Sequence, residues 1–322
     1  MAVAERGAHP VRIGVVTRLL KDAAVRPYKI ISLNTQDGGH DDLGRDAPTR
    51  WAGLMGWLRE QRADIACLQE AMYFDRYFKL RLRRAVRDTA MAKGYLAHAN
   101  ATTAGYRFHS AILVSRRVRV LAHGADRTRY HHVLGWAEIA VPGLPVKLEL
   151  RNIHLNPFDP RHRAIEVAPF EVLAGPGRAA LVLGDRQGLG PGVAEPEDWG
   201  TVPAHLRNGL MLPPGEREAA DHTPELLMER SGFLDAARAA GLGHQPTGGF
   251  GPGDIARRGD VVCYSPYLAP AVDGYTVHRE TVEEGWSDHC AISVLLRPGR
   301  IPWIAQGAMG PASGAARWHG AR

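Results

Sequence analysis

Residues 146–155 read V-K-L-E-L-R-N-I-H-L and are followed at once by Asn156 and Pro157. Apolar and polar residues alternate along this stretch, which predicts a β-strand with one face in a core. The strand ends at His154, an ionisable side chain. Because loops that follow strands place functional groups on a rigid scaffold, the stretch predicts both a sheet and a candidate site at the edge of that sheet.

Short apolar runs alternate with helical patterns on both sides of this strand. Strands are expected over 28–33, 64–68, 110–114, 118–121, 134–141, 179–183, 261–264 and 291–296. Helices are expected over 48–61, with Asp46 as its candidate N-cap, and over 75–93, 161–173 and 223–240. This order predicts an α/β protein with two mixed sheets packed face to face and helices outside, in one domain.

Three regions differ from this pattern. Residues 1–27 form an N-terminal flank and residues 298–322 a Gly-, Ala- and Pro-rich tail, so the domain is expected over 28–297. Residues 188–215 are rich in Gly and Pro and follow a strand end directly. A loop of that length is usually functional, so we expect it to form one wall of a substrate cleft.

Composition excludes several classes of protein. The three cysteines, among 322 residues, form no C-x-x-C pair, which argues against a disulfide framework and a structural zinc module. No apolar run approaches the roughly 18 residues of a membrane span. The sequence therefore predicts a cytoplasmic protein, and it leaves the oligomeric state open.

The net charge of +6 and a pI near 9.4 first suggest a nucleic-acid partner. Residues 1–28 carry five cations and two acids, or +3, and residues 297–322 carry four cations and no acid, or +4. The remaining body, 29–296, holds +6 minus 7, or −1. The charge thus lies in the flanks, which weakens the case for a long polyanionic partner.

Polar side chains stand at the ends of several predicted strands. They are Asn34, Glu70, His154, Asp185, Asp260 and the run Ser287-Asp288-His289. Four carboxylates gathered at one end of a sheet sandwich would repel each other unless a cation or protons intervened. Oxygen ligands without thiolates favour Mg²⁺ or Mn²⁺, metals that commonly act on phosphate esters.

This ordered series resembles the endonuclease/exonuclease/phosphatase superfamily over residues 28–296. The resemblance rests on Asn34, L-Q-E ending at Glu70, H-L-N-P from His154, the G-D pair ending at Asp185, Asp260 before an apolar strand, and the terminal S-D-H. It implies a four-layer α/β sandwich and a metal-dependent phosphoesterase.

The resemblance also implies roles for individual residues. Glu70 would be the main metal ligand, with Asn34 and Asp288 close to the metal. His289 would contact the scissile phosphate and be oriented by Asp260. His154 would hold a phosphate oxygen or help to protonate the leaving group, and Asp185 would position and deprotonate the attacking water.

The pattern departs from the family at Gln187, where the family motif G-D-x-N has an asparagine. The amide is kept but its reach changes, which leaves three readings open: a slow hydrolase, a shifted substrate, or a site turned to other chemistry. The neighbouring Arg186 adds a cation that either binds phosphate or pairs with a carboxylate.

Three further features have two readings each. His131 and His132 point to opposite faces of a strand, so one of them, assigned here as His132, is expected to line the substrate cleft rather than both to bind one ion. Trp286 either stacks on substrate, which is the role assigned here, or packs in the core. The basic residues Arg76, Lys79, Arg83 and Arg87 form either a nucleic-acid grip or a solvated helix face.

The leading hypothesis is therefore a phosphoesterase that uses Mg²⁺ or Mn²⁺ and acts on a small phosphorylated molecule. The first alternative is a DNA or RNA endonuclease of the same superfamily. The second is a related scaffold that has lost hydrolysis and serves binding or biosynthetic chemistry.

Overall fold

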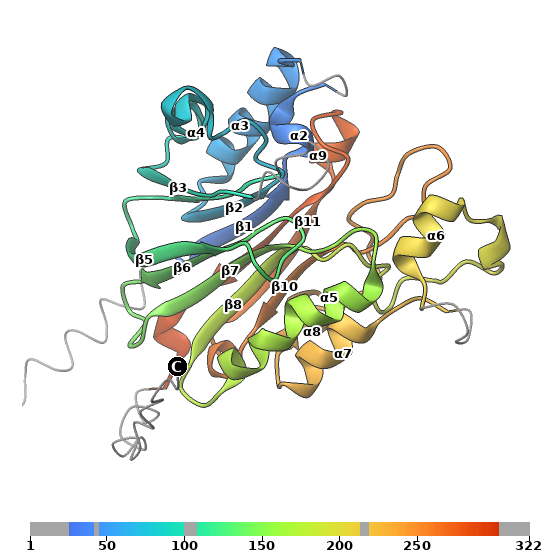
Figure 1. Cartoon of the computed structure of the whole chain (residues 1–322). Coiled ribbons are helices and arrows are strands. Elements are labelled where there is room, and N and C mark those ends of the chain that lie inside the picture. Colours follow the sequence, from blue (N-terminus) through green and yellow to red (C-terminus); the bar gives the residue numbers. More distant parts are fainter. Residues whose placement is uncertain (1–25, 42–44, 100–107, 213–218, 303–322) are drawn as a thin grey trace, which may run out of the picture.

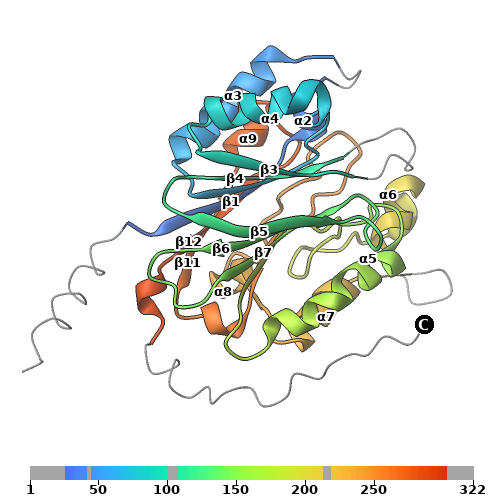
Figure 2. The same ribbon diagram turned by 60° about the vertical axis from the view of Figure 1, so that its left-hand side comes forward.

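The computed structural model describes residues 26–41, 45–99, 108–212 and 219–302. Two six-stranded mixed sheets pack face to face, with helices on their outer faces (Figure 1, Figure 2). This architecture confirms the predicted α/β sandwich. Flanking residues 1–25 and most of the predicted tail, 303–322, lie outside the described residues.

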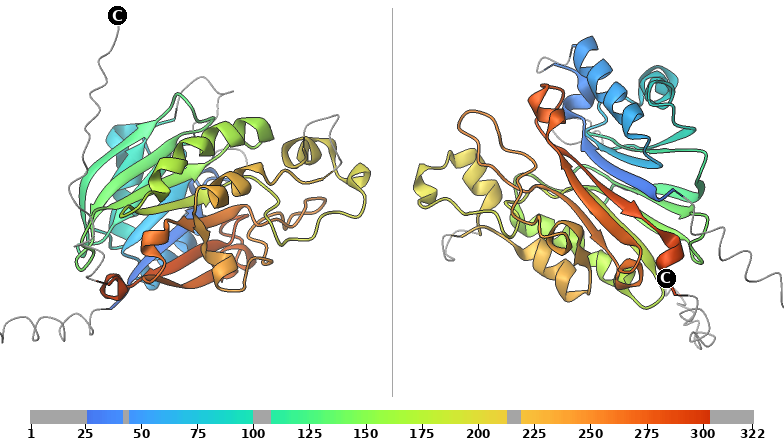
Figure 3. Two further views of the ribbon diagram at one scale, coloured as in Figure 1. Left: turned by 90° about the horizontal axis from the view of Figure 1, so that it is seen from below. Right: turned by 180° about the vertical axis from the view of Figure 1, so that it is seen from behind.

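The first sheet has the order β11-β12-β1-β2-β4-β3. Its strands are β1 (Tyr28–Asn34), β2 (Ile65–Gln69), β3 (Lys93–Ala97), β4 (Ser110–Val114), β11 (Val272–His278) and β12 (Ala291–Leu296). Figure 3 shows β11 and β12, from the end of the domain, lying beside β1 from its start. The helices near this sheet are α2 (Gln36–Gly39), α3 (Pro48–Gln61), α4 (Arg76–Asp88) and α9 (Glu280–Glu283).

The second sheet has the order β5-β6-β7-β8-β10-β9. Its strands are β5 (Arg119–Asp126), β6 (Leu134–Ala140), β7 (Leu148–His154), β8 (Ala179–Asp185), β9 (Leu234–Asp235) and β10 (Asp260–Tyr264). The associated helices are α5 (Pro160–Val167), α6 (Ala204–Leu210), α7 (Thr223–Arg230) and α8 (Ala236–Ala239). Short 3-10 turns, η1 to η4, cover Ala168–Ala174, Trp199–Thr201, Pro266–Leu268 and Pro298–Arg300.

Strand alternation builds three apolar layers. In β1, Ile30 points between the two sheets, whereas Ile31 and Leu33 pack under α3. A third layer lies under α5, α7 and η1 and includes Phe170 and Phe233. Neighbouring side chains in a strand point to opposite faces, so one apolar strand supplies two layers at once.

The structure corrects several element boundaries. The predicted helix over 75–93 ends at Asp88, and the edge strand β3 follows it. The residues of β3 are half-exposed, so their apolar pattern is too weak to predict a strand from the sequence. Strand β11 was missed for the same reason, since it is an edge strand interrupted by Gly274. The helix over 223–240 is divided into α7 and α8 with β9 between them.

Three smaller corrections concern caps and loops. The N-cap of α3 is Ala47, while Asp46 pairs with Arg81 at 3.1 Å. The loop 188–215 contains η2 and α6, although residues 213–215 lie outside the described part. The packed chain continues past 297, because Ile301 is buried in the core between the sheets. Within the described ranges, no helix is long and apolar enough to cross a bilayer.

Candidate active site

The pairing register of the strands brings the strand-end residues together. On the second sheet, Asp185 pairs with His154 on one side and with Asp260 on the other, so the three lie in one row across β7, β8 and β10. On the first sheet, Asn34 pairs with Gln69, and Glu70 follows directly. Neighbouring strands are about 4.8 Å apart, so each row is compact.

Asp185 lies at the centre of the site and is fully buried. Its Oδ2 accepts hydrogen bonds from the side-chain amides of Asn34 (3.2 Å) and Gln187 (2.6 Å). Its Oδ1 accepts from the backbone N–H of Gln187 at 2.9 Å. The bond from Asn34 crosses from one sheet to the other, so Asp185 is held by both halves of the sandwich.

His289 and Asp260 form a buried pair beside Asp185. His289 Nδ1 lies 2.8 Å from Asp260 Oδ2, and His289 Nε2 lies 3.8 Å from Asp185 Oδ2. Burial alone would lower the pKa of His289, but the charges of Asp260 and Asp185 outweigh it and raise that pKa well above the ordinary value. Asp260 fixes the orientation of the ring, so that Nε2 is directed toward Asp185 and the site.

Glu70 stands on the first sheet at the exit of β2. Its Oε1 accepts from Asn34 (3.1 Å) and its Oε2 from the backbone N–H of Asp37 (2.9 Å). Burial, followed by the charge of Asp288, raises the pKa of Glu70 to about 7. Asp288 itself is exposed at the same edge. Burial and the nearby charge of Asp288 thus both disfavour the charged form of Glu70.

His154 is linked to Asp185 through Gln187. The side-chain nitrogen of Gln187 lies 3.1 Å from His154 Nε2 and 2.6 Å from Asp185 Oδ2. Since a carboxylate only accepts, we assign the amide nitrogen to this side, and His154 Nε2 accepts its second N–H. Burial, together with the positive His289, lowers the pKa of His154 to about 3.

His132 stacks on His154, with the ring centroids 4.1 Å apart, and is buried. It is therefore adjacent to the site, as its assignment to the cleft requires. His131 and His132 lie in a bend before β6 rather than on a strand, and their rings meet edge-on with centroids 4.7 Å apart. The expectation that they point to opposite faces of a strand is therefore wrong. Burial lowers the pKa values of both rings.

Arg186 does not face the site. It follows Asp185 along the chain, so its side chain points to the opposite face of the sheet, where Nε lies 2.8 Å from Glu225 Oε1. The guanidinium is 5% exposed. Of the two roles left open by the sequence, pairing with a carboxylate is the one observed, and the assignment of Arg186 as a substrate-binding residue is wrong.

Trp286 packs rather than projecting toward substrate. Its indole belongs to the apolar layer under α3, and a Cβ placed on Gly53 would meet its Nε1 at 2.2 Å. The assignment of Trp286 to substrate stacking is therefore corrected to a packing role. The missing side chain of Gly53 is what lets the indole approach the helix.

The four basic residues expected on one face of α4 do not form such a face in the structure. Tyr77, Phe78 and Lys79 have positive φ values of 49°, 55° and 61°. The first turn thus does not continue the right-handed helix, and Arg76 and Lys79 do not share a helical face with Arg83. Tyr77 and Phe78 are 79% and 93% exposed instead.

Several contacts that support the site were not predicted from the sequence. Ser287 Oγ donates to the carbonyl of Asn34 at 2.8 Å and accepts from the backbone N–H of His289 at 3.1 Å. Thr247 Oγ1 accepts from the backbone N–H of Asp260. Below the site, Gln69 donates to Asn152 at 2.6 Å across the two sheets. The available signal was a polar residue at the end of an apolar strand, at Gln69, and a polar residue at an apolar position of an alternating strand, at Asn152.

The residues present fit a divalent cation. Asp185, Asp260 and His289 each offer an atom within 4.8 Å of the others. His289 Nδ1 is already engaged with Asp260 at 2.8 Å, so we assign this group mainly to hydrogen bonding. Glu70 with Asn34 and Asp288 supplies oxygen donors and uncompensated negative charge, which is the donor set that Mg²⁺ and Mn²⁺ prefer.

Comparison with known proteins shows the fold. No family model matches the chain, and no curated protein matches it. Among solved structures, an endonuclease/exonuclease/phosphatase family protein from Bacteroides thetaiotaomicron is similar with TM-score 0.57 and 13% identity, over 84% of this chain and 95% of that one. An AP endonuclease from Archaeoglobus fulgidus gives TM-score 0.56 and 16% identity, over 84% and 99%. A truncated TDP2 from Caenorhabditis elegans gives TM-score 0.54 and 20% identity, over 84% and 97%.

Proposed function

From the premise that this chain has the fold of the endonuclease/exonuclease/phosphatase superfamily, we propose that it is a divalent-metal-dependent hydrolase of phosphoric esters that uses an activated water. One observation carries the proposal. Glu70 from one sheet, Asp185 from the other and the His289–Asp260 pair meet in one partly buried site, with Asn34 bonded to both Glu70 and Asp185. Two neighbours of the same fold are described as endonucleases, which supports this chemistry.

Glu70, Asn34 and Asp288 would hold the metal, Mg²⁺ or Mn²⁺. When bound, such an ion withdraws electron density from the phosphoryl oxygens and compensates the charge that builds on them. This assignment is supported by the contact between Asn34 and Glu70 at 3.1 Å and by the raised pKa of Glu70, which marks a carboxylate that a nearby cation would stabilise.

The chain's own residues would activate the water and bind the phosphate. Asp185, held by the amides of Asn34 and Gln187, orients a water molecule and accepts its proton. His289 donates from Nε2 to a phosphate oxygen and stabilises its negative charge. Gln187 keeps the amide contact with Asp185 despite its longer side chain, which supports retained hydrolysis rather than a site turned to other chemistry. His154 completes the row as a hydrogen-bonding partner.

Two candidate functions differ in the class of substrate. The near-neutral body of the chain, −1 over residues 29–296, supports a small phosphorylated substrate. The endonuclease alternative is supported by the exposed Tyr77 and Phe78, which follow Glu70 by a few residues and are accompanied by the exposed Arg76. Aromatic rings and cations in this arrangement suit bases and phosphates of a nucleic acid.

The test measures hydrolysis of bis(p-nitrophenyl) phosphate, p-nitrophenyl phosphate and supercoiled plasmid in Mg²⁺ and Mn²⁺. We expect Glu70→Gln to lose roughly a hundredfold or more of the rate, since the metal contributes several kcal/mol to the transition state. Glu60→Gln, an exposed position on α3, is the matched control and should keep the rate. Equal rates for Glu70→Gln and wild type would refute the proposal, and salt-sensitive plasmid nicking would select the endonuclease.

A further inference from the structure

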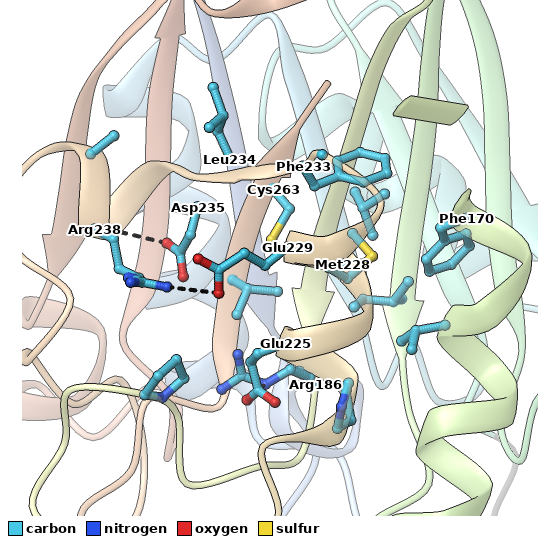
Figure 4. Close-up of a pocket in the computed structure, with 18 residues that line it drawn as sticks. Phe170, Arg186, Glu225, Met228, Glu229, Phe233, Leu234, Asp235, Arg238 and Cys263 are labelled. Carbon is cyan, nitrogen blue, oxygen red and sulfur yellow. Dashed lines mark hydrogen bonds and ion pairs between the residues drawn. The ribbon is translucent and has the colours of Figure 1, made fainter. Parts of the chain in front are cut away.

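A second cavity lies on the outer face of the second sheet, between α7 and strands β8 and β10 (Figure 4). Its volume is about 480 Å³. One part of its lining is apolar and comes from the sheet, from α5, from α7 and from η1. These residues are Ile153, Val167, Phe170, Val182, Met228 and Val261.

The other part of the lining is charged. At one end Arg186 faces Glu225 from α7, with Nε and Oε1 2.8 Å apart and side chains 5% and 10% exposed. At the rim Arg238 bonds Glu229 at 3.3 Å, and both side chains are more than half exposed. Figure 4 shows Arg186 and Glu225 together, away from the Arg238–Glu229 pair. The cavity therefore joins an apolar body to a buried ion pair.

Hydrogen-bonding capacity at the buried end is left unused within the described residues. Oε2 of Glu225 is buried without a hydrogen-bond partner, while Oε1 lies 2.8 Å from Nε of Arg186 in an ion pair that is poorly aligned for a hydrogen bond. The guanidinium of Arg186 uses Nη2 on the carbonyl of Arg258, and a guanidinium has five N–H donors. A buried polar atom without a partner destabilises the protein, so a ligand that donates a hydrogen bond to Oε2 of Glu225 gains affinity from that contact.

The charges around the cavity balance. Arg186 and Arg238 face Glu225, Glu229 and Asp235, and the third acid is compensated by Arg258, whose Nη1 lies 2.8 Å from Asp235 Oδ2. The buried Arg163, which also acts on Glu225, is balanced by Asp221 at 3.7 Å. A ligand with a net charge would leave that charge uncompensated in a poorly solvated place. A molecule that carries one positive and one negative group has no net charge and would leave no charge uncompensated.

We propose that this cavity is a binding site for a small zwitterion with an apolar body, of the class of the hydrophobic α-amino acids. The ammonium group would bond Glu225, the carboxylate would bond Arg186, and the apolar side chain would contact Met228 and Phe170. The volume exceeds that of a single aromatic amino acid, so the class is not limited by size.

This site is separate from the candidate active site. Arg186 points to the outer face of the sheet and Asp185 to the inner face, so a molecule in the cavity does not touch the phosphate-binding residues. Binding at the cavity can therefore be measured without any assay of hydrolysis, and its outcome does not depend on the proposed function.

The experiment is a titration of the full chain with L-phenylalanine and L-leucine, followed by thermal unfolding and calorimetry. We expect a saturable rise in Tm of roughly 5 °C at a hundredfold excess over Kd. 2-Phenylethylamine and 3-phenylpropionate carry only one of the two charges and should bind at least tenfold more weakly. No saturable effect of either amino acid up to about 20 mM would overturn the proposal, because such binding would be weaker than millimolar. Equal binding of the single-charge analogues would also overturn it.

Two variants locate the binding. Glu225→Gln should weaken L-phenylalanine binding at least tenfold, while Glu229→Gln, one turn further along α7 at the exposed rim, should change it less than twofold. If Glu225→Gln unfolds, Met228→Trp fills the apolar part without altering a charge and should abolish binding. Undiminished binding in whichever of the Glu225 and Met228 variants folds would place the ligand elsewhere and overturn the proposal.

Discussion

At the scale of the residue, Gln187 shows how the site accommodates its departure from the family motif. Its backbone has φ 62°, a left-handed conformation that asparagine and glycine adopt more easily than glutamine. The longer side chain bends back so that its amide still reaches Asp185 and also reaches His154. The additional methylene is therefore absorbed locally, at a cost in backbone strain.

Replacement of this residue by asparagine tests the strain. We expect Gln187→Asn to raise the free energy of unfolding by about 0.5 kcal/mol, because asparagine tolerates the left-handed region better. Urea unfolding monitored by circular dichroism measures the change. A loss of stability would show that the amide contact with His154 is worth more than the strain.

Asp260 orients His289, and a variant at Asp260 tests whether this orientation matters for catalysis. Asp260→Asn removes the carboxylate that bonds His289 Nδ1, and we expect kcat for phosphodiester hydrolysis to fall about a hundredfold or more, with KM little changed. Asp254→Asn, on the loop before β10, is the control and should leave both constants unchanged. An Asp260→Asn variant with wild-type kcat would remove the His289–Asp260 pair from the mechanism.

At the scale of the element, two glycines decide how closely neighbouring parts approach. Gly184, directly before Asp185, has φ 138°, and a Cβ there would lie 2.0 Å from the carbonyl oxygen of Ile153 on β7. The glycine of the G-D pair thus allows β7 and β8 to close together at the point where His154 and Asp185 are held in register. On α3, Gly53 has the same role toward Trp286.

Helix α3 contains its own control for the packing of Trp286. Gly53→Ala should lower the free energy of unfolding by about 1–3 kcal/mol, because the new methyl group collides with the indole. Gly56→Ala meets no atom within 4 Å and should raise stability by about 0.5–1 kcal/mol through helix propensity. Chemical denaturation of both variants gives the comparison, and two changes of the same sign would contradict the packing role of Trp286.

Elements were predictable from sequence where burial was strong. The helix over 48–61 and the strand over 110–114 have the predicted bounds, because their apolar positions face a core along their whole length. The edge strands β3 and β11 carry too little of that signal. The turn at Tyr77–Lys79 depends on left-handed backbone at three residues that have no glycine among them, which no local propensity predicts.

At the scale of the whole molecule, the order of polar strand ends indicated the candidate site, but the support of that site depends on pairing between distant segments. Ser287 bonds the carbonyl of Asn34 from the other end of the domain, and Gln69 bonds Asn152 from the other sheet. Sequence spacing carries no information on such contacts. The orientation of the Arg186 side chain could have been predicted from the sequence. Arg186 directly follows Asp185, and consecutive side chains along a strand point to opposite faces of the sheet.

The two sheets bring acidic residues from both halves of the molecule to one site. We therefore expect hydrolysis only when a cation compensates the negative charge of these residues. The most direct measurement is the rate of bis(p-nitrophenyl) phosphate hydrolysis by the wild-type chain after complete chelation and then on stepwise return of Mg²⁺ or Mn²⁺. The proposed function predicts a rate at background after chelation that rises saturably with the metal. An unchanged rate in excess chelator would contradict it.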